Sequence, residues 1–233
     1  MRELEQRAYS VLGRNPILYM DMMEALRRGS GSVAAVREDG VLVYIRSSRA
    51  YLLAAENQQA GEALCQGLNQ AAQVAVHQKE TARFLGDKLG WQSMECRAAA
   101  YLEMNPPLQK DFDLRELALD QGDEVLELFG EVLGQEELRE ALHTKMLHGI
   151  YESNQLLGTV GLYPEGGIGL LAVSPEGQDK GLEEALVAHI TGWCLEKYLA
   201  PFVHIPAWDE AALALYERMG YTIGNGNVYW LGG

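Results

Sequence analysis

Residues Val173 to Leu186 read Val-Ser-Pro-Glu-Gly-Gln-Asp-Lys-Gly-Leu-Glu-Glu-Ala-Leu, and this stretch decides the fold. An apolar strand precedes it and a long amphipathic helix follows it. The first N–H groups of a helix have no partner within the helix, and they lie at the positive end of its dipole. Gly181 leaves these amides uncovered, while Gln178 and Lys180 add a neutral donor and a cation. The stretch therefore predicts an anion-binding loop.

The helix after this loop carries one apolar stripe, which predicts that the loop sits on a packed, immobile element. The stripe residues recur at spacings of three and four: Leu182, Ala185, Leu186, His189, Ile190, Trp193 and Cys194.

The spacing Gln178-x-x-Gly181 resembles the pyrophosphate loop of the GNAT superfamily of N-acetyltransferases. Val173-x-Pro175 before the loop and Ala185-Leu186 after it fit the same pattern. The family motif is Gln or Arg, x, x, Gly, x, Gly or Ala, and this chain has Glu183 at the last position.

A second motif, residues 209–221, reads Asp-Glu-Ala-Ala-Leu-Ala-Leu-Tyr-Glu-Arg-Met-Gly-Tyr and resembles the closing helix of that family. Asp209 stands where the family usually has Asn. The two motifs occur in the family's order, with a strand-like segment at 201–205 between them. The resemblance implies an α/β (α+β) fold with a mixed, mostly antiparallel central sheet flanked by helices.

Bulk properties exclude several classes of protein. The chain has 233 residues, enough for one large domain or two of roughly 100 to 130 residues, and its 48% hydrophobic content supports a buried core. It has no apolar run of membrane-spanning length, and its charged N-terminus lacks the apolar core of a signal peptide. We therefore expect a cytoplasmic protein without a membrane partner.

The net charge of −14 opposes nucleic-acid binding, which depends on clustered Lys and Arg, and it favours an amine substrate. Cys65, Cys96 and Cys194 show neither disulfide nor zinc spacing, so we expect three buried apolar residues and no metal site.

The turn-rich stretch Asn105-Pro106-Pro107-Leu108-Gln109-Lys110 predicts a linker over 105–111, because two prolines stop a helix and remove strand donors. It divides the chain into domains 1–104 and 112–233. In the second domain the patterns predict strands at 112–117 and 168–173, helices at 122–129 and 135–147, and a hairpin of 149–152 with 155–163. In the first they predict a hairpin of 33–37 with 41–46, a strand at 51–55 and a helix at 60–72.

The first domain faintly repeats the second. Residues 79–91 align with 209–221, so that Ala82, Leu85 and Gly90 coincide with Ala212, Leu215 and Gly220. The first copy has Gly86 where the second has Tyr216, and its junction at 55–61 lacks the Gln-x-x-Gly spacing. We interpret 1–104 as a degenerate GNAT-like domain that has lost cofactor binding, with an unrelated α/β domain as the alternative.

The resemblance implies acetyl-CoA as cosubstrate, with its pyrophosphate on the loop amides and its pantetheine arm beside the strand that ends at Val173. A neutral amine would attack the thioester directly, without a metal. The implied cofactor-binding residues are Leu171, Ala172, Val173, Gln178, Asp179, Lys180, Gly181, Leu182, Glu183 and Asp209.

Tyr216 matches the family's frequent catalytic tyrosine and is expected to protonate the leaving thiolate, although its place on an apolar helix stripe also fits a core residue. The strand 167–173 carries no carboxylate, so the candidate bases are Glu165 and His204, with Glu152 and Tyr163 as further choices.

The predicted function is N-acetyl transfer to the primary amine of a small molecule. Glu183 supports the alternative of a catalytically degenerate CoA- or ligand-binding module, because a carboxylate about 4 Å from a phosphate costs roughly 1 to 4 kcal/mol. A third class, tandem-domain peptide ligases that use aminoacyl-tRNA, is disfavoured by the acidic charge. The acceptor amine and a possible homodimer stay open.

Overall fold

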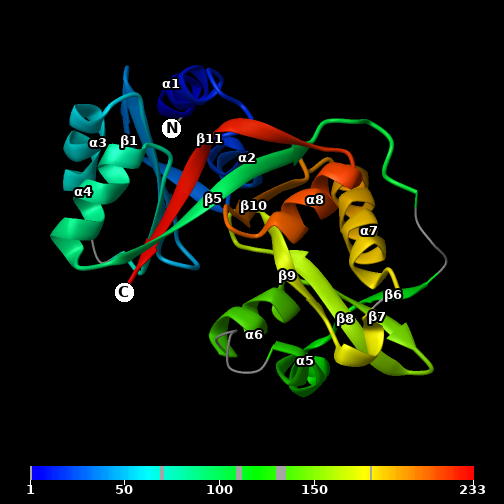
Figure 1. Ribbon diagram of the computed structural model, residues 1–233. Coiled ribbons are helices and arrows are strands. Elements are labelled where there is room, and N and C mark those ends of the chain that lie inside the picture. The colour runs from blue at the N-terminus through cyan, green and yellow to red at the C-terminus, as the bar shows by residue number, and fades with distance from the viewer. Residues whose placement is uncertain (1, 69–70, 109–111, 130–134, 179) are drawn as a thin grey trace.

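One continuous sheet of eleven strands runs through the molecule, with helices on both of its faces (Figure 1). The computed structural model describes residues 2–68, 71–108, 112–129, 135–178 and 180–233. The strand order is β1-β2-β3-β4-β11-β5-β10-β9-β8-β7-β6, in which β3–β4 and β9–β10 are parallel and the other pairs are antiparallel. The mixed, mostly antiparallel sheet flanked by helices is confirmed.

The two halves of the chain share one order of elements. The first half contains α1 (Arg2–Leu12), α2 (Met20–Arg28), β1 (Gly31–Arg37), β2 (Gly40–Ile45), β3 (Ala50–Ala55), α3 (Gln58–Leu64), β4 (Gln73–Val76), α4 (Lys79–Leu89) and β5 (Gln92–Tyr101). The second contains β6 (Asp113–Glu116), α5 (Gly122–Phe129), α6 (Gln135–His143), β7 (Leu147–Glu152), β8 (Gln155–Leu162), β9 (Ile168–Val173), α7 (Leu182–Glu196), β10 (Phe202–Pro206), α8 (Glu210–Arg218) and β11 (Tyr221–Gly232). The second half begins with the extra strand β6. Apart from this strand, both halves have the order α-α-β-β-β-α-β-α-β.

Two predicted helices were too long. The helix expected over 60–72 begins at Gln58 and ends at Leu64, because Cys65–Gly67 tighten into a 3₁₀ turn and Leu68 is extended. The helix expected over 135–147 ends at His143, and Lys145 adopts a left-handed backbone with φ 58° before β7 begins.

Side chains of the central strands alternate between two cores. In β2, Val41 and Val43 pack under α1 and α2, whereas Leu42 packs under α3 and α4. In β8, Leu156 packs with α5 and α6, and Leu157 packs with α7 and α8. Strands buried on both faces need apolar residues at nearly every position, which explains the near-continuous apolar runs of β2 and β3. All three cysteines are buried and unpaired, as predicted.

The halves exchange their last strands. β11, from the end of the chain, lies between β4 and β5, while β5 lies between β11 and β10 (Figure 1). β11 pairs with β4 from Tyr229↔Val76 to Gly232↔Gln73, and β5 pairs with β10 from Cys96↔Pro206 to Ala100↔Phe202. The sequence suggests a sheet in each half, and the structure joins the two.

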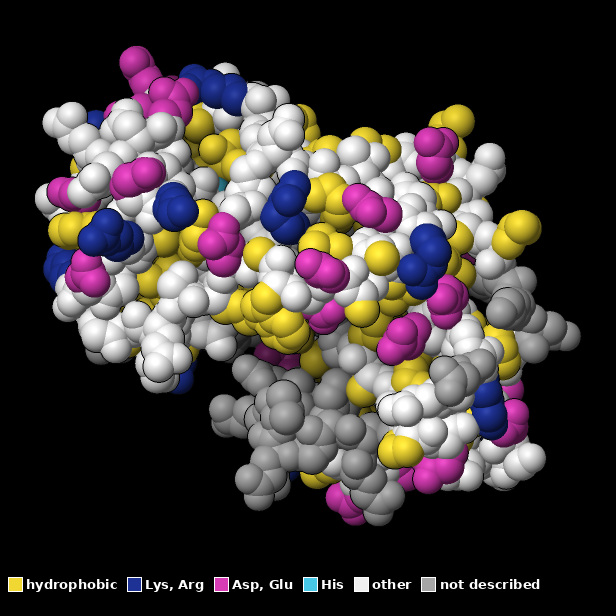
Figure 2. All heavy atoms as spheres, viewed as in Figure 1, with side chains coloured by type: hydrophobic (Ala, Val, Ile, Leu, Met, Phe, Trp, Pro, Cys, Tyr) yellow, Lys and Arg dark blue, Asp and Glu magenta, His cyan; other side chains and the backbone are white. Residues whose placement is uncertain are grey.

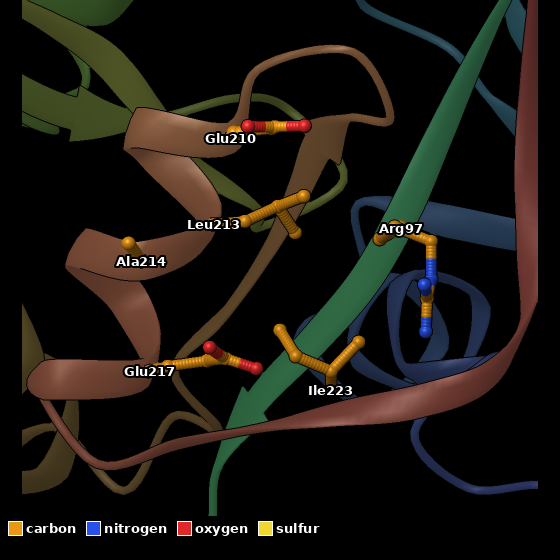
Figure 3. A pocket seen from close by; sticks show the side chains of 6 residues that line it. All are labelled: Arg97, Glu210, Leu213, Ala214, Glu217 and Ile223. Carbon is orange, nitrogen blue, oxygen red and sulfur yellow. The ribbon is translucent and has the colours of Figure 1, made fainter.

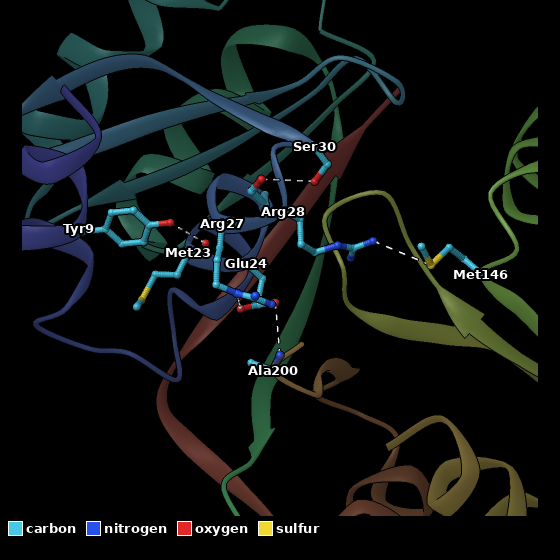
Figure 4. A network of polar contacts seen from close by, with 9 residues as sticks. Tyr9, Met23, Glu24, Arg27, Arg28, Ser30, Met146 and Ala200 are labelled. Carbon is cyan, nitrogen blue, oxygen red and sulfur yellow. Dashed lines mark hydrogen bonds and ion pairs between the residues drawn. The ribbon is translucent and has the colours of Figure 1, made fainter. Parts of the chain in front are cut away.

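Helix α2 also connects the halves (Figure 4). The Glu24 carboxylate accepts two hydrogen bonds from Arg27, at 2.7 and 2.6 Å, and one from the Ala200 amide, at 3.3 Å. Arg28 Nη2 lies 4.0 Å from Met146 Sδ. Residues 102–108 form neither helix nor strand, and 109–111 lie outside the described residues, so the predicted division of the chain into two domains stays a prediction.

Candidate functional site

The parallel strands β9 and β10 meet at one residue pair and then separate. Val203 pairs with Ile168, and no further β9–β10 pair is formed in the described strands. On its other side β9 stays bonded to β8, with Gly158 opposite Val173 and Thr159 opposite Ala172. The backbone of Leu171, Ala172 and Val173 therefore has one edge without a strand partner, and these residues are half-buried. Such an edge offers N–H and C=O groups to an extended ligand.

A bulge bends β9 at the point where the strands part. Leu170 has φ 51°, a left-handed conformation that is rare for leucine, and the β8–β9 register shifts between Thr159 and Gly161. The buried Thr159 hydroxyl donates a 3.0 Å hydrogen bond to the Leu170 carbonyl. This contact satisfies a carbonyl that the bulge removes from the strand ladder.

The open edge leads to the start of α7. Ser174 N donates to Leu157 O at 2.7 Å, residues Pro175–Gly177 form a 3₁₀ turn, and Gly181 is the N-cap with φ 70°. No side chain among the described residues caps this helix. Its first amides are thus available to an anion, and glycine is the residue that adopts this backbone without strain.

Charged side chains around the loop partly offset one another. Lys180 Nζ lies 2.6 Å from Glu152 Oε2 at the end of β7, so its charge is already paired. Glu184 pairs with Arg218 at 3.2 Å and ties α7 to α8. Gln178 is exposed, Leu182 is buried below the loop, and Asp179 lies outside the described residues.

Tyr216 projects from α8 toward this region and is only 4% exposed. Its ring packs edge-on against Tyr221 at 5.1 Å between centroids. Burial is the largest cause that raises the pKa of Tyr216, and the neighbouring Tyr163 and Glu183 add to the rise. Its hydroxyl makes no hydrogen bond with the described residues, yet it is not among their enclosed unpartnered atoms. The phenol therefore stays protonated over the physiological range.

Glu183 occupies the second position of α7 and is exposed. The Glu183 carboxylate is one of the charges that raise the pKa of Tyr216, after burial and Tyr163. Asp209 is the N-cap of α8, and its Oδ1 accepts from Ala212 N at 2.9 Å. The capping role follows from general helix chemistry, and the proposed cofactor contact stays a prediction.

The two predicted bases, His204 and Glu165, lie in a buried polar cluster where the halves meet. His204 Nδ1 accepts from Trp230 Nε1 at 3.0 Å, which leaves the proton of the neutral ring on Nε2, 4.0 Å from Asp21 Oδ2. Burial lowers the pKa of His204 to about 4. Burial raises the pKa of Glu165 to about 8, and the charge of Asp21 adds to this shift. The described contacts bring neither residue to Tyr216.

Sequence patterns did not predict the ion pair at the centre of this cluster. His77 Nδ1 donates to Leu53 O at 2.9 Å, and Nε2 lies 2.9 Å from Asp21 Oδ2, both side chains being fully buried. Because both ring nitrogens face acceptors, the imidazolium is favoured. The Asp21 carboxylate raises the pKa of His77 against the opposing effect of burial, and His77 lowers that of Asp21 likewise. The only sequence signal is Asp21, a charged residue beside the apolar positions of residues 20–28.

The corresponding strands of the first half do not separate. β3 and β4 pair over four positions, from Ala50↔Gln73 to Leu53↔Val76, and His77 N donates a further bond to Leu53 O. Asn57 caps α3 by accepting from Ala60 N, and Glu56 pairs with Arg14. The first half thus lacks the open edge and the uncapped helix start that the second half has.

Within the described residues, no helix has the length and apolar character needed to cross a bilayer. No group of three or more His, Cys, Asp or Glu side chains in that part of the chain is placed to hold a metal ion.

Comparisons with known proteins agree with this geometry. Residues 117–228 match the family model described as an acetyltransferase (GNAT) domain. A search of curated proteins finds no match. A solved Drosophila protein is similar over 100% of this chain and 95% of its own, with 15% identity and a TM-score of 0.75.

Two further solved structures share the fold. A GCN5-related N-acetyltransferase-like protein from Streptococcus suis has 16% identity and a TM-score of 0.60, with 99% of this chain and 98% of that chain covered. A GCN5-related N-acetyltransferase from Kribbella flavida has 11% identity and a TM-score of 0.63, with 94% and 95% covered.

Proposed function

We propose that the protein transfers an acetyl group from acetyl-CoA to the primary amine of a small molecule by direct attack, and the match of residues 117–228 to an acetyltransferase (GNAT) family model supports this. The observation that carries this proposal is the unpaired edge of β9, which leads directly to the uncapped start of α7. An extended amide-containing arm and a pyrophosphate need these two features in this order.

The residues present fit such a cosubstrate. The backbone of Leu171 and Val173 would pair with the arm, and the amides that follow Gly181 would hold the pyrophosphate. Tyr216 would donate its proton to the departing sulfur, a role that its raised pKa supports because the phenol stays protonated.

The base remains a choice between Glu165 and His204. Since the pKa of Glu165 lies near 8, its carboxyl group is mostly protonated at neutral pH and would accept a proton only under more alkaline conditions. His204 is neutral at pH 7, but its Nδ1 lone pair is already used by Trp230. Both assignments therefore require water or a rearrangement on substrate binding.

We also propose that residues 1–104 are a second, degenerate GNAT-like domain. The shared order of elements supports duplication, and the closed β3–β4 pair supports loss of cofactor binding. On the face shown in Figure 2, basic side chains are interspersed with acidic ones, which fits a small-molecule partner better than nucleic acid. A cytoplasmic location and a homodimer remain proposals.

Calorimetry with acetyl-CoA tests the cosubstrate assignment. We expect micromolar binding to the wild-type protein and an affinity about tenfold lower for Gly181→Val, because valine is strained at φ 70° and covers the loop amides. Gly90→Val is the matched control, since Gly90 caps α4 with φ 68° and nothing lies within 4 Å of an added Cβ. It should lose similar stability and bind normally.

Absence of acetyl-CoA binding to the wild-type protein would contradict the proposal. Binding without acetyl transfer to any amine in a broad screen would instead favour the degenerate binding module, for which the acidic Glu183 beside the site is the supporting feature.

A further inference from the structure

A cavity of about 280 Å³ lies on the side of α8 that faces β5 and β11 (Figure 3). Glu210, Leu213, Ala214 and Glu217 line it from α8, Arg97 lines it from β5, and Ile223 lines it from β11. The strand exchange creates this cavity, because β5 comes from the first half and the other two elements come from the second.

The charges on its walls are complementary but unpaired. Arg97 stands on the strand wall, and the two glutamates stand on the helix wall (Figure 3). None of the ion pairs among the described residues joins them. Opposite charges that face one cavity without meeting can each bind an opposite group of a ligand between them.

Arg97 has N–H donors that make no hydrogen bond to the described residues. Its Nη2 donates one long hydrogen bond of 3.3 Å to Gly224 O, and its Nε is enclosed without a partner in the described part of the chain. A guanidinium group carries five N–H donors arranged to grip a carboxylate in a bidentate manner. Because Nε is enclosed by the protein, the guanidinium N–H groups at the tip of Arg97 are the ones left to bind a carboxylate ligand.

We propose that this cavity binds an amino-acid-sized zwitterion. Its carboxylate meets Arg97, its ammonium group meets one of the two glutamates on the helix wall, and an aliphatic side chain contacts Leu213, Ala214 and Ile223. A lone anion would face two uncompensated carboxylates, and a lone cation would leave the Arg97 donors unused. A zwitterion carries a charge that pairs with Arg97 on the strand wall and one that pairs with a glutamate on the helix wall.

The cavity is separate from the proposed acetyl-CoA site. Tyr216 is buried against Tyr221, the first residue of β11, whereas Ala214 and Glu217 of the cavity are exposed on another side of α8. The ligand therefore occupies a second site on the helix that carries Tyr216, and its binding does not depend on the proposed activity.

Titration of the isotopically labelled protein followed by NMR tests the proposal. The probe is L-leucine, compared with 4-methylpentanoate, which lacks the ammonium group, and 3-methylbutylamine, which lacks the carboxylate. We expect leucine to shift the Ala214 and Ile223 signals at millimolar concentration, and each single-charge analogue to bind about tenfold more weakly.

Three variants locate the site. Arg97→Gln should weaken leucine binding about tenfold, because it keeps donors but removes the charge. Ala214→Trp should abolish binding by filling the cavity from an exposed position, with no change in charge. Arg218→Gln, on α8 but outside the cavity, should bind leucine as the wild type does.

The proposal is overturned if leucine causes no shift in the wild-type protein, or if Ala214→Trp binds it normally. Equal binding of 3-methylbutylamine would make this a simple cation site, and equal binding of 4-methylpentanoate a simple anion site, and either result rejects the zwitterion. If the NMR spectrum shows that Arg97→Gln is unfolded, the analogue series and Ala214→Trp still test the proposal.

Discussion

At the scale of single residues, Tyr216 combines burial with a hydroxyl that makes no hydrogen bond to the described part of the chain. Tyr221 is its neighbour on the next strand and is equally buried, but its hydroxyl is 2.6 Å from Thr191 Oγ1. The Tyr221 hydroxyl is therefore held by a hydrogen bond within the described residues, whereas the Tyr216 hydroxyl is not. A buried phenol with a raised pKa and no fixed partner fits an acid that acts on a bound ligand.

Tyr216→Phe should lower kcat about 10- to 100-fold on a confirmed amine, since removal of a general acid typically has an effect of this size. CoA affinity should stay within about twofold, because Phe keeps the packing against Tyr221. Steady-state kinetics and calorimetry measure the two quantities.

Tyr221→Phe is the matched control. It should cost roughly 1 kcal/mol of stability through the lost Thr191 hydrogen bond, with kcat nearly unchanged. Equal turnover of wild type and Tyr216→Phe would reject the acid role.

At the scale of elements, the β9 bulge directs the strand edge toward the ligand. A leucine at φ 51° is strained, and the Thr159 hydroxyl bonded to its carbonyl helps to hold that conformation. The bulge starts beside the Ile168↔Val203 pair, after which β9 and β10 diverge. The opening for the ligand is therefore built into the strand rather than into a flexible loop.

Thr159→Val should weaken acetyl-CoA binding about tenfold and lower the free energy of unfolding by roughly 1 to 2 kcal/mol, because the Leu170 carbonyl loses its buried partner. Calorimetry and urea unfolding report the two effects. Thr191→Val, which removes a buried hydroxyl bonded to Val187 O and to the Tyr221 hydroxyl, should lose at least as much stability and bind the cofactor normally. If both variants bound alike, the bulge would have no special role.

At the scale of the whole molecule, the strand exchange makes the halves depend on each other. Val228 of β11 is fully buried in the core beneath α1 and α2, although it lies near the end of the chain. Neither half completes its sheet without a strand of the other. We therefore expect one cooperative unfolding transition.

Val228→Ala should lower the free energy of unfolding by about 2 kcal/mol through the cavity it leaves. Hydrogen exchange should show equal loss of protection in β2–β3 and in β8–β9, since global unfolding exposes both. Val33→Ala on the edge strand β1, which is only half-buried, should have a smaller effect. Loss of protection confined to β2–β3 would show that the halves unfold independently.

The sequence by itself determined the elements whose signals are local. The strand at 168–173 and the helix at 122–129 have the predicted bounds, since an apolar run of strand length and a 3.6-residue period are readable without a partner. The loop before α7 was predicted for the same reason, because Gly181 and the apolar stripe after it define a helix start within a few residues.

Only the tertiary structure decided which distant segments meet. The exchange of β5 and β11, the pairing of Asp21 with His77, and the cavity between Arg97 and α8 each join residues far apart in the chain. Strand partners are chosen by backbone hydrogen bonds and by burial, which have no local signature, so a sequence pattern states that a strand exists but not where it pairs. The same reason explains why the sequence did not show that His204 and Glu165, two of the candidate bases, are enclosed where the halves meet.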